Sequence, residues 1–575
     1  MKTLTTCALA CSLLLLTPSC SDKKFLEVAP TGVLTDAQLN TPANIEKQVI
    51  AAYSQLGNDV YGAPFTSMWP YSNTRSGDAY KGGGGTADID AFHFYETFSF
   101  NRPDLGNTNE VWSLLFIGVS RANDALRRLN TVSDAEMPTK AVRQGEARFL
   151  RGHFYFLLKE LFKQVPYIDE TVLTNDYNTI SNVALTNDQL WGKIADDFRF
   201  AAANLPATQP EIGRANKSAA QAYLAKTVLY QAYTQGDNHA VTGIDAAKLQ
   251  EVVTLTDQVI ASGKYSLHSD FANNFLSAYD NGVESVFAIQ FSRNDGTPKG
   301  RTHRGNELNY PMNPEYGCCS FHQPSQNLVN AFKTDAQGLP LFTTFNNTDL
   351  LATRPTDFQT TPLDPRIDHT VAIPTHPYKY DPNFLFRNSW VRVPEVYGYF
   401  MSMKESVLPS DPTFQKNPPF MSTSKNWTLI RYADVLLWKA EALIELNRAA
   451  EARPLINQIR QRAQNSTNLL KTSAGQPISN YRIGLYPAGQ WNQTYAREAL
   501  RFERRLEFAM EGYRFFDLVR WGIAADYLNQ YFAVEKTKRQ YLQTARFAPG
   551  RDEYMPIPLN QINFSKGLYK QNTGW

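Results

Sequence analysis

Cysteine is scarce in this chain, which has only five among its 575 residues. Cys7 and Cys11 lie in the first apolar stretch, Cys20 follows it, and Cys318 and Cys319 are adjacent. A disulfide framework therefore does not hold the fold together. The adjacent pair can form a disulfide between neighbours in an oxidising compartment or stay as two thiols. Stability must come from a large core, which a chain of this length can bury.

Neither sign of charge is in excess. The chain has 57 lysines and arginines against 55 aspartates and glutamates, a formal net charge of +2. We find no basic stripe of the kind that binds nucleic acid and no basic amphipathic helix for a membrane surface. After the N-terminus, no apolar run approaches the roughly 20 residues of a membrane-spanning helix. The sequence predicts no nucleic-acid partner.

Catalytic and metal-binding motifs are also lacking. The chain has no GxSxG, HExxH or CxxC pattern, and its eight histidines are scattered. In the glycine run Lys81–Thr86 the lysine precedes the glycines, the wrong order for a phosphate loop, so we expect a flexible loop. Arg504 and Arg505 lie beside Glu503 and Glu507, and we expect them to keep both carboxylates ionised and unable to donate a proton. We predict no catalytic residue, metal or cofactor.

The N-terminus has the pattern of a lipoprotein signal peptide. Lys2 supplies a positive charge, Ala8–Leu16 is too short to span a bilayer, and Thr17, Pro18 and Ser19 precede Cys20. Thr17 stands where a lipobox usually has an aliphatic residue. We predict a signal peptide over 1–19, lipidation of Cys20 and a tether over 20–42.

Helical periodicity dominates two regions. In 43–261, apolar residues recur at helical spacing in 139–163, with Ala147, Leu150 and Phe154 on one face. Further helices are predicted at 43–57, 108–130, 187–204, 216–235 and 247–261, with Asn187 and Asn216 as N-caps.

The second helical region begins at residue 428 and continues to the C-terminus. Two stripes in 428–463 meet at a turn, with small Ala440 and Ala452 where two helices must approach closely. This spacing is typical of a tetratricopeptide-like hairpin.

Between the two regions, 262–427 is rich in proline, glycine and asparagine, with one alternating strand at Ser285–Phe291. The predicted fold is mainly α: a tetratricopeptide-like scaffold of helical hairpins, a long loop-rich region and a few short strands.

Aromatic residues make up 13% of the chain, and many lie in these loops. Aromatic rings suit the apolar faces of sugars, and neighbouring polar side chains can pair with hydroxyl groups. The first candidate binding segment contains Trp69, Tyr71, Asn73, Arg75, Asp78 and Tyr80; the second contains Tyr310, Tyr316, Phe321 and His322; Trp390 is a third candidate. The competing interpretation of the first segment is a surface loop that packs on its own aromatic rings, and a lone tryptophan such as Trp390 is more often part of the core.

Several ordered segments resemble one family. The stretch 498–521 is similar to the C-terminal signature of the SusD/RagB family, and 25–30, 146–152, Asp364–Arg366 and Ile430–Leu437 resemble further family motifs in the same order. Many relatives have Trp-Gly about where Phe321-His322 stands, which suggests a different ligand here.

The resemblance implies a function that composition alone does not. Family members are lipoproteins of the Bacteroidetes outer membrane that face the cell exterior, bind glycans without cleaving them, and cap a SusC-like TonB-dependent transporter. It also implies that the loop-rich part carries the ligand site. An alternative is a helical-repeat subunit that binds only the transporter, its loop aromatics serving as protein contacts. A glycoside hydrolase is a further alternative, and a reducing-sugar assay distinguishes it.

Overall fold

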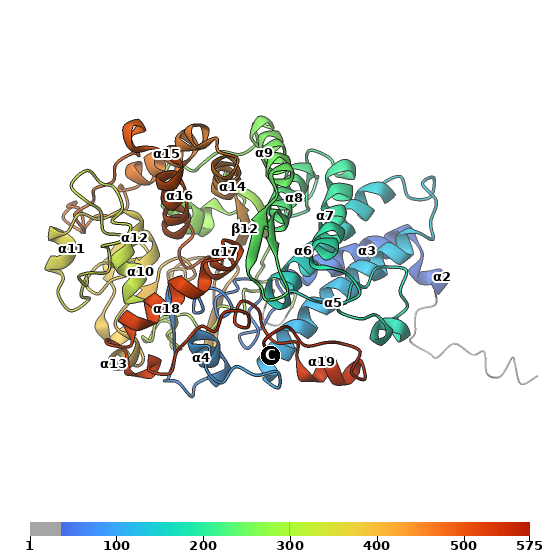
Figure 1. Cartoon of the computed structure of the whole chain (residues 1–575), viewed down its shortest axis with the longest axis horizontal. Helices are drawn as coiled ribbons and strands as arrows, with labels where there is room; N and C mark the ends of the chain where they lie inside the picture. Colours follow the sequence, from blue (N-terminus) through green and yellow to red (C-terminus); the bar gives the residue numbers. More distant parts are fainter. Residues whose placement is uncertain (1–35, 298–299) are drawn as a thin grey trace, which may run out of the picture.

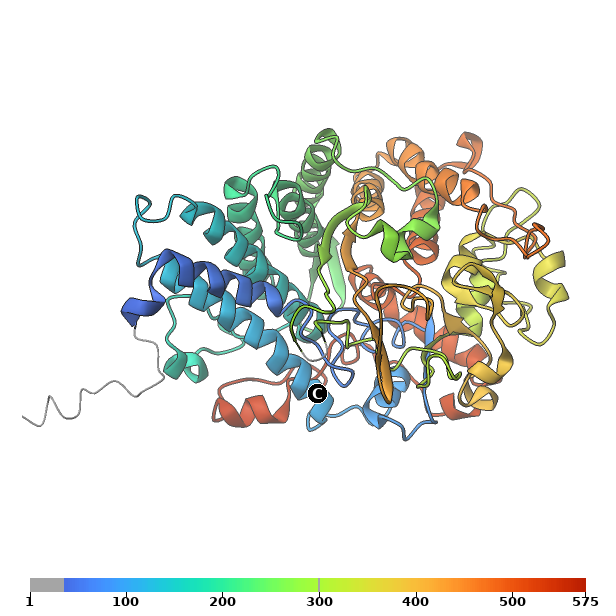
Figure 2. The same cartoon turned by 180° about the vertical axis from the view of Figure 1, so that it is seen from behind.

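The computed structural model describes residues 36–297 and 300–575. The predicted signal peptide 1–19, the lipidation site Cys20 and the tether as far as residue 35 lie outside the described residues. The described chain is mainly helical, as predicted, with only short strands among the helices (Figures 1 and 2).

The N-terminal helices form an array in which each helix packs on the next in sequence. α5 packs on α6, α6 on α7, α7 on α8 and α8 on α9, while α3 covers α5 and α6. Their bounds are α2 Asp36–Leu39, α3 Pro42–Ser54, α5 Gly106–Leu129, α6 Lys140–Phe162, α7 Asn187–Asn204, α8 Lys217–Ala232 and α9 Ala246–Ala261; the short α4 is Asp90–Thr97. The helices predicted from periodicity are confirmed.

Three ends in this array differ from the prediction, and the first is that of α3, which ends at Ser54 instead of residue 57. Thr186, not Asn187, caps α7: its side chain accepts from the Gln189 N–H, and the Gln189 side chain accepts from the Thr186 N–H. Asn216 caps α8 as predicted, since its side chain accepts from the Ala219 N–H. α8 ends three residues before the predicted 235, because β2 (Tyr233–Gln235) pairs with β3 (Val241–Ile244) instead.

The second helical region joins the first directly. α14 (Tyr432–Glu445) packs on α9, and α15 (Ala449–Asn465) and α16 (Gln493–Glu507) pack on α14. The start predicted at 428 is wrong. Trp427–Arg431 forms β12, which pairs antiparallel with β4 (Ser285–Ile289) and buries Ile430.

The chain between α9 and α14 contains only short elements. Its strands are β4, β5 (Phe321–Pro324), β6 (Val371–Ala372), β7 (Pro377–Tyr378), β8 (Asp381–Leu385), β9 (Met401–Ser402), β10 (Phe414–Asn417), β11 (Phe420–Thr423) and β12. Its helices are α10 (Gln326–Ala331), α11 (Thr356–Thr360), α12 (Arg366–Thr370) and α13 (Pro394–Tyr397). In the described part of the chain, the strands form two-stranded sheets only.

The C-terminal segment returns across the front of the molecule in Figure 1. It comprises α17 (Arg514–Arg520), α18 (Ala524–Glu535) and α19 (Leu559–Phe564). Gly512 lies between α16 and α17 as predicted. Its φ is +88°, and a Cβ there would lie 2.2 Å from the Ser67 carbonyl oxygen. Across 36–297 and 300–575, no helix has the length and apolar character needed to cross a bilayer.

Buried ion pairs lock α16 to the loop-rich region. Glu507 contacts Arg366, Arg431 and Arg462, and Glu503 pairs with Arg366 at 2.7 Å. Burial by itself raises the pKa of Glu507, but the three guanidinium groups hold it well below its ordinary value. We call this cluster the inner ion network; its members are Glu284, Asp364, Arg366, Lys404, Arg431, Arg460, Arg462, Glu503, Glu507 and Glu511.

The partners predicted for the two glutamates are wrong. Arg504 pairs instead with Asp517 at 2.8 Å, and Arg505 pairs with Asp78 at 2.7 Å. Side chains next to each other in a helix point in different directions, so each finds its partner on another segment.

Candidate functional site

A two-stranded ladder joins the first two candidate segments. β1 (Ala79–Gly82) pairs antiparallel with β5, placing Tyr80 opposite Gln323 and Gly82 opposite Phe321. The third candidate lies close by, since the Trp390 carbonyl accepts from the Met312 N–H at 2.7 Å. The structure thus brings together segments that are more than 200 residues apart in the sequence.

Trp69 and His322 are stacked inside this junction. Their ring centroids are 5.2 Å apart, and the Trp69 Nε1 donates to the Gly305 carbonyl. His322 Nε2 lies 2.9 Å from Asn73 Nδ2, and its Nδ1 lies 2.5 Å from a Glu405 carboxylate oxygen. Both rings are fully buried. This arrangement fixes both candidate segments against each other.

Arg75, Asp78 and Tyr80 face the C-terminal region. The Arg75 guanidinium lies 3.9 Å from the centre of the Phe515 ring, and burial lowers the pKa of Arg75 to about 10. The Tyr80 hydroxyl donates to a Glu535 carboxylate oxygen at 2.8 Å. With Trp69, Tyr71 and Asn73, these side chains are at most 1% exposed. None presents a surface to solvent in this structure, so direct ligand contact by them stays a prediction.

The second and third candidates share an aromatic cluster. Tyr310, Tyr316 and Trp390 pack with Tyr378 and other rings of β7 and β8. Trp390 is 8% exposed and the two tyrosines less. Nearby, Cys318 and Cys319 form a disulfide between neighbours, one of the two states left open by the sequence.

The glycine run is held rather than flexible. The Lys81 ammonium donates to the carbonyls of Gly85 and Asp88 and lies 4.9 Å from the centre of the Phe321 ring. A Cβ on Gly83 would lie 2.4 Å from the same ring, so only glycine fits there. The expectation of a flexible loop is therefore wrong, because Lys81 is a buried anchor for the run.

The solvent-facing groups at this junction come from residues that the sequence did not single out. Asp88 and Arg392 form an ion pair at 2.9 Å, with 32% and 39% of their side chains exposed. The β10–β11 hairpin lies against Gly317 of the second candidate segment, and at the start of β11 the half-buried Phe420 lies 5.3 Å from the Tyr61 ring, which is 38% exposed. No local pattern marks them, because each pair joins segments hundreds of residues apart. We call Tyr61, Asp88, Arg392 and Phe420 the rim.

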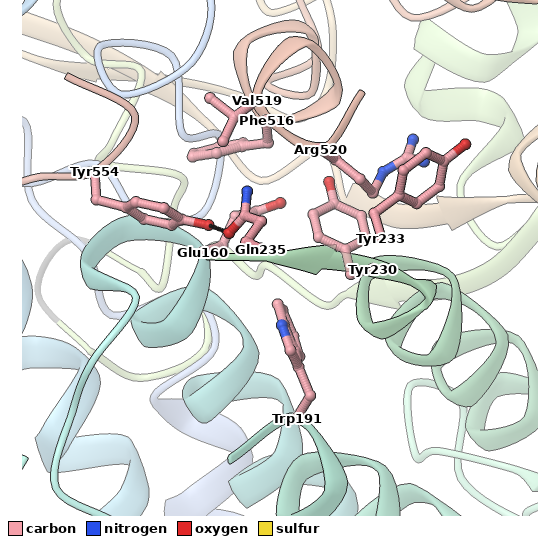
Figure 3. Close-up of a pocket in the computed structure, with 9 residues that line it drawn as sticks. All are labelled: Glu160, Trp191, Tyr230, Tyr233, Gln235, Phe516, Val519, Arg520 and Tyr554. Atoms are coloured by element: carbon pink, nitrogen blue, oxygen red, sulfur yellow. Dashed lines mark hydrogen bonds between the residues drawn. The ribbon is translucent and has the colours of Figure 1, made fainter. Parts of the chain in front are cut away.

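A separate pocket between α6, α7, α8 and α17 is shown in Figure 3. Trp191, Tyr230, Tyr233 and Tyr554 line it beside Glu160, whose pKa is raised to about 7 by burial. Its volume is about 20 Å³, which is room for about one water molecule. The pocket is too small for a sugar ring. Across the described residues, no group of three or more His, Cys, Asp or Glu side chains converges as a metal site would require.

Comparisons with known proteins agree on one family. The model of the SusD family matches residues 283–575, and a second, described as starch-binding and associating with the outer membrane, matches residues 24–229. The chain is 24% identical to SusD-like protein P2 of Formosa agariphila, and the match covers 98% of each chain.

Solved structures show the same fold. A SusD homolog from Bacteroides thetaiotaomicron has a TM-score of 0.69 at 21% identity, covering 93% of this chain and 98% of its own. Surface glycan-binding protein A from the same species, solved with laminarihexaose, has a TM-score of 0.65 at 20% identity and covers 92% and 99%. A laminarin-binding SusD-like protein has a TM-score of 0.65 at 22% identity and covers 93% and 100%.

Proposed function

Because the chain belongs to the SusD family, a family of glycan-binding proteins, we propose that it captures oligosaccharide and delivers it to a SusC-like TonB-dependent transporter. The match to the family over residues 283–575 is the observation that carries this proposal. In this proposal Cys20 carries a lipid that anchors the protein to the outer membrane, facing the cell exterior. The protein binds its ligand without cleaving it.

The rim is where we propose that the glycan is held. Tyr61 and Phe420 offer ring faces for a sugar, and Asp88 and Arg392 offer an acceptor and donors for hydroxyl groups. The candidates predicted from the sequence act beneath the rim, where buried contacts such as Trp69 against His322 hold the loops in position.

Glycan binding is tested with the mature chain lacking Cys20. Calorimetry against laminarin, starch and further polysaccharides should give binding to at least one class. Replacing both rim rings (Y61A/F420A) should weaken it about tenfold, because two stacking contacts are lost. The matched control is Phe200→Ala, which removes a half-buried ring of α7 that packs against Arg148 in the N-terminal array. Equal losses in both variants would contradict the rim as the site.

The same samples test the remaining parts of the proposal. No reducing sugar should be released from the bound glycan, and the full-length protein should co-purify with a SusC-like transporter. The burial of Trp69, Tyr71 and Tyr80 keeps these rings from contacting either a glycan or a protein, so the alternative of an interaction subunit without a glycan site would also use other, exposed residues. Co-purification without binding to any polysaccharide would support that alternative.

A further inference from the structure

A groove separates the N-terminal helices from the strand β4. Its volume is about 930 Å³, within the range of roughly 300–1,000 Å³ typical of ligand pockets. One wall is the exposed face of α3 with Arg121 of α5, and the facing wall is the end of β4 with residues 300–304. The β10–β11 hairpin borders it, since the Ser422 hydroxyl donates to Thr302 Oγ1 at 2.9 Å. The groove adjoins the Tyr61–Phe420 side of the rim, but none of the four rim residues lines it.

Positive charge dominates the lining of this groove. Five basic side chains line it, Lys47, Arg121, Arg214, Arg301 and Arg304, against two acidic ones, Asp59 and Glu211. Arg214 is neutralised by Glu46, Glu146 and Glu211, and Arg304 lies 3.4 Å from Glu307.

Three cations in the groove form no ion pair with any residue in 36–297 or 300–575. Lys47 and Arg301 are exposed, and the Lys47 ammonium donates a hydrogen bond to the Asn44 amide oxygen. Arg121 is half-buried and donates through Nη1 to the Ala51 carbonyl and the Ser54 hydroxyl. A guanidinium has five N–H donors, so most of the Arg121 donors stay available. These groups can pair with an incoming anion.

Asp59 lies on the floor of the groove and does not oppose this charge. It is 2% exposed, one of its oxygens accepts from the Thr66 N–H, and the other has no hydrogen-bond partner in the structure. Burial raises the pKa of Asp59 to about 7, so near neutral pH much of this carboxyl is protonated. A protonated carboxyl can donate a hydrogen bond to a ligand oxygen.

The groove also offers ring and backbone surface. Phe291 is half-buried and stacks on His303 at 5.0 Å, and the Gly57 backbone lies against the edge of the Phe291 ring. At the edge of the groove, Ile50 and Ile212 are 48% and 77% exposed. Mixed apolar and cationic surface suits a ligand that has both ring faces and negative charges.

We propose that this groove binds an acidic oligosaccharide, whose sugars carry carboxylate or sulfate groups. The choice of a glycan rests on the proposed function, and the choice of an acidic one rests on the unpaired Lys47, Arg121 and Arg301. Arginine forms bidentate pairs with carboxylate and with tetrahedral oxyanions. The groove thereby selects the charge class of the captured glycan.

The experiment compares ligands that share a backbone and differ in charge. Calorimetry of the mature chain lacking Cys20 uses polygalacturonate against its methyl ester, and dextran sulfate against dextran. At least one acidic ligand should bind at least tenfold more tightly than its neutral counterpart. Raising the salt from 0.05 M to 0.5 M should reduce that difference, because exposed charges are screened. The two ligand pairs distinguish carboxylate from sulfate recognition.

Variants locate the effect. K47Q/R301Q removes two exposed, unpaired cations and should weaken binding of the acidic ligand about tenfold. The matched control K471Q/R546Q removes two exposed cations elsewhere and should leave it unchanged. Thermal midpoints of both variants should equal that of the parent chain.

Each other outcome contradicts the inference. Equal binding of charged and neutral partners, or equal losses in both variants, overturns it while leaving the proposed function intact. Poly-glutamate binding as tightly as the acidic glycan overturns the choice of a glycan. Binding to no acidic ligand overturns the inference. If no neutral polysaccharide binds either, the proposed function is overturned as well.

Discussion

The N-terminal helical array and the loop-rich segment 262–427 are held together in different ways. In the array, apolar stripes of helices that follow one another in sequence pack together, as α6 does on α5 and α7. In the loop-rich segment the strands have two to five residues, and buried charges fix the loops. Arg366 reaches Glu503, and Lys404 reaches Glu511 at 2.7 Å. Where helices and strands are short, buried ion pairs instead of periodic apolar packing hold the segments in place.

The largest test of this contrast is Glu507→Gln. Three buried guanidinium groups contact Glu507, and removing its charge leaves them without that partner. We expect the free energy of unfolding to fall by about 3–5 kcal/mol, measured by urea denaturation with circular dichroism. The control is Glu451→Gln, which breaks an exposed pair with Arg448 and should change little. A loss no greater than the control would show that the network is dispensable.

Acid should weaken the same network. Burial opposes ionisation of Glu284, Asp364 and Glu507, but their arginine partners lower all three pKa values below the ordinary ones. The native state then binds fewer protons than the unfolded chain, so stability is full above the unfolded pKa of about 4 and is lost as pH falls towards the native values. Urea midpoints from pH 7 to pH 3 should fall less steeply for Glu507→Gln than for the parent chain. Parallel curves would contradict this.

In the array, close packing is the sensitive feature. A Cβ on Gly118 of α5 would lie 2.5 Å from the Phe154 ring of α6. Gly118→Ala should cost about 1–3 kcal/mol in unfolding free energy through overpacking. Gly192→Ala is the matched control: this glycine lies in α7 with nothing within 4 Å, and the substitution should stabilise by about 0.5–1 kcal/mol. Equal effects at the two sites would mean that helix propensity, not packing, decides.

The smallest expected effect is local. Thr186→Ala removes the side-chain cap of α7 and should cost about 1 kcal/mol, with faster amide hydrogen exchange in the first turn of α7 only. Thr186→Ser keeps the hydroxyl and should retain the protection. Faster exchange spread over the loop-rich segment would contradict the independence of the two regions.

The difference between the helical array and the loop-rich segment also determines how much of the structure could be predicted from the sequence. Helical periodicity is a local signal, so the array from α3 to α9 was predicted to within a few residues. The strand β12 was missed because its pairing partner β4 lies about 140 residues earlier. A short apolar run does not distinguish a strand from the first turn of a helix.

The candidate site was predictable in its segments but not in its exposed side chains. The β1–β5 ladder joins the first two candidate segments. Whether a ring in those segments faces solvent depends on distant partners, such as Glu535 for Tyr80. Tyr61 and Phe420 carry no local signal, since their pairing joins segments more than 350 residues apart.

The packing of α9 on α14 has a consequence for how such a protein can change. The array continues from α9 to α14 although 170 residues lie between Ala261 and Tyr432. The intervening stretch therefore begins and ends at helices that pack directly on each other. The entropy of closing a loop rises only slowly with its length, so insertions and deletions there cost the scaffold little. This stretch can therefore vary in length and sequence over generations while the helices that support it stay the same.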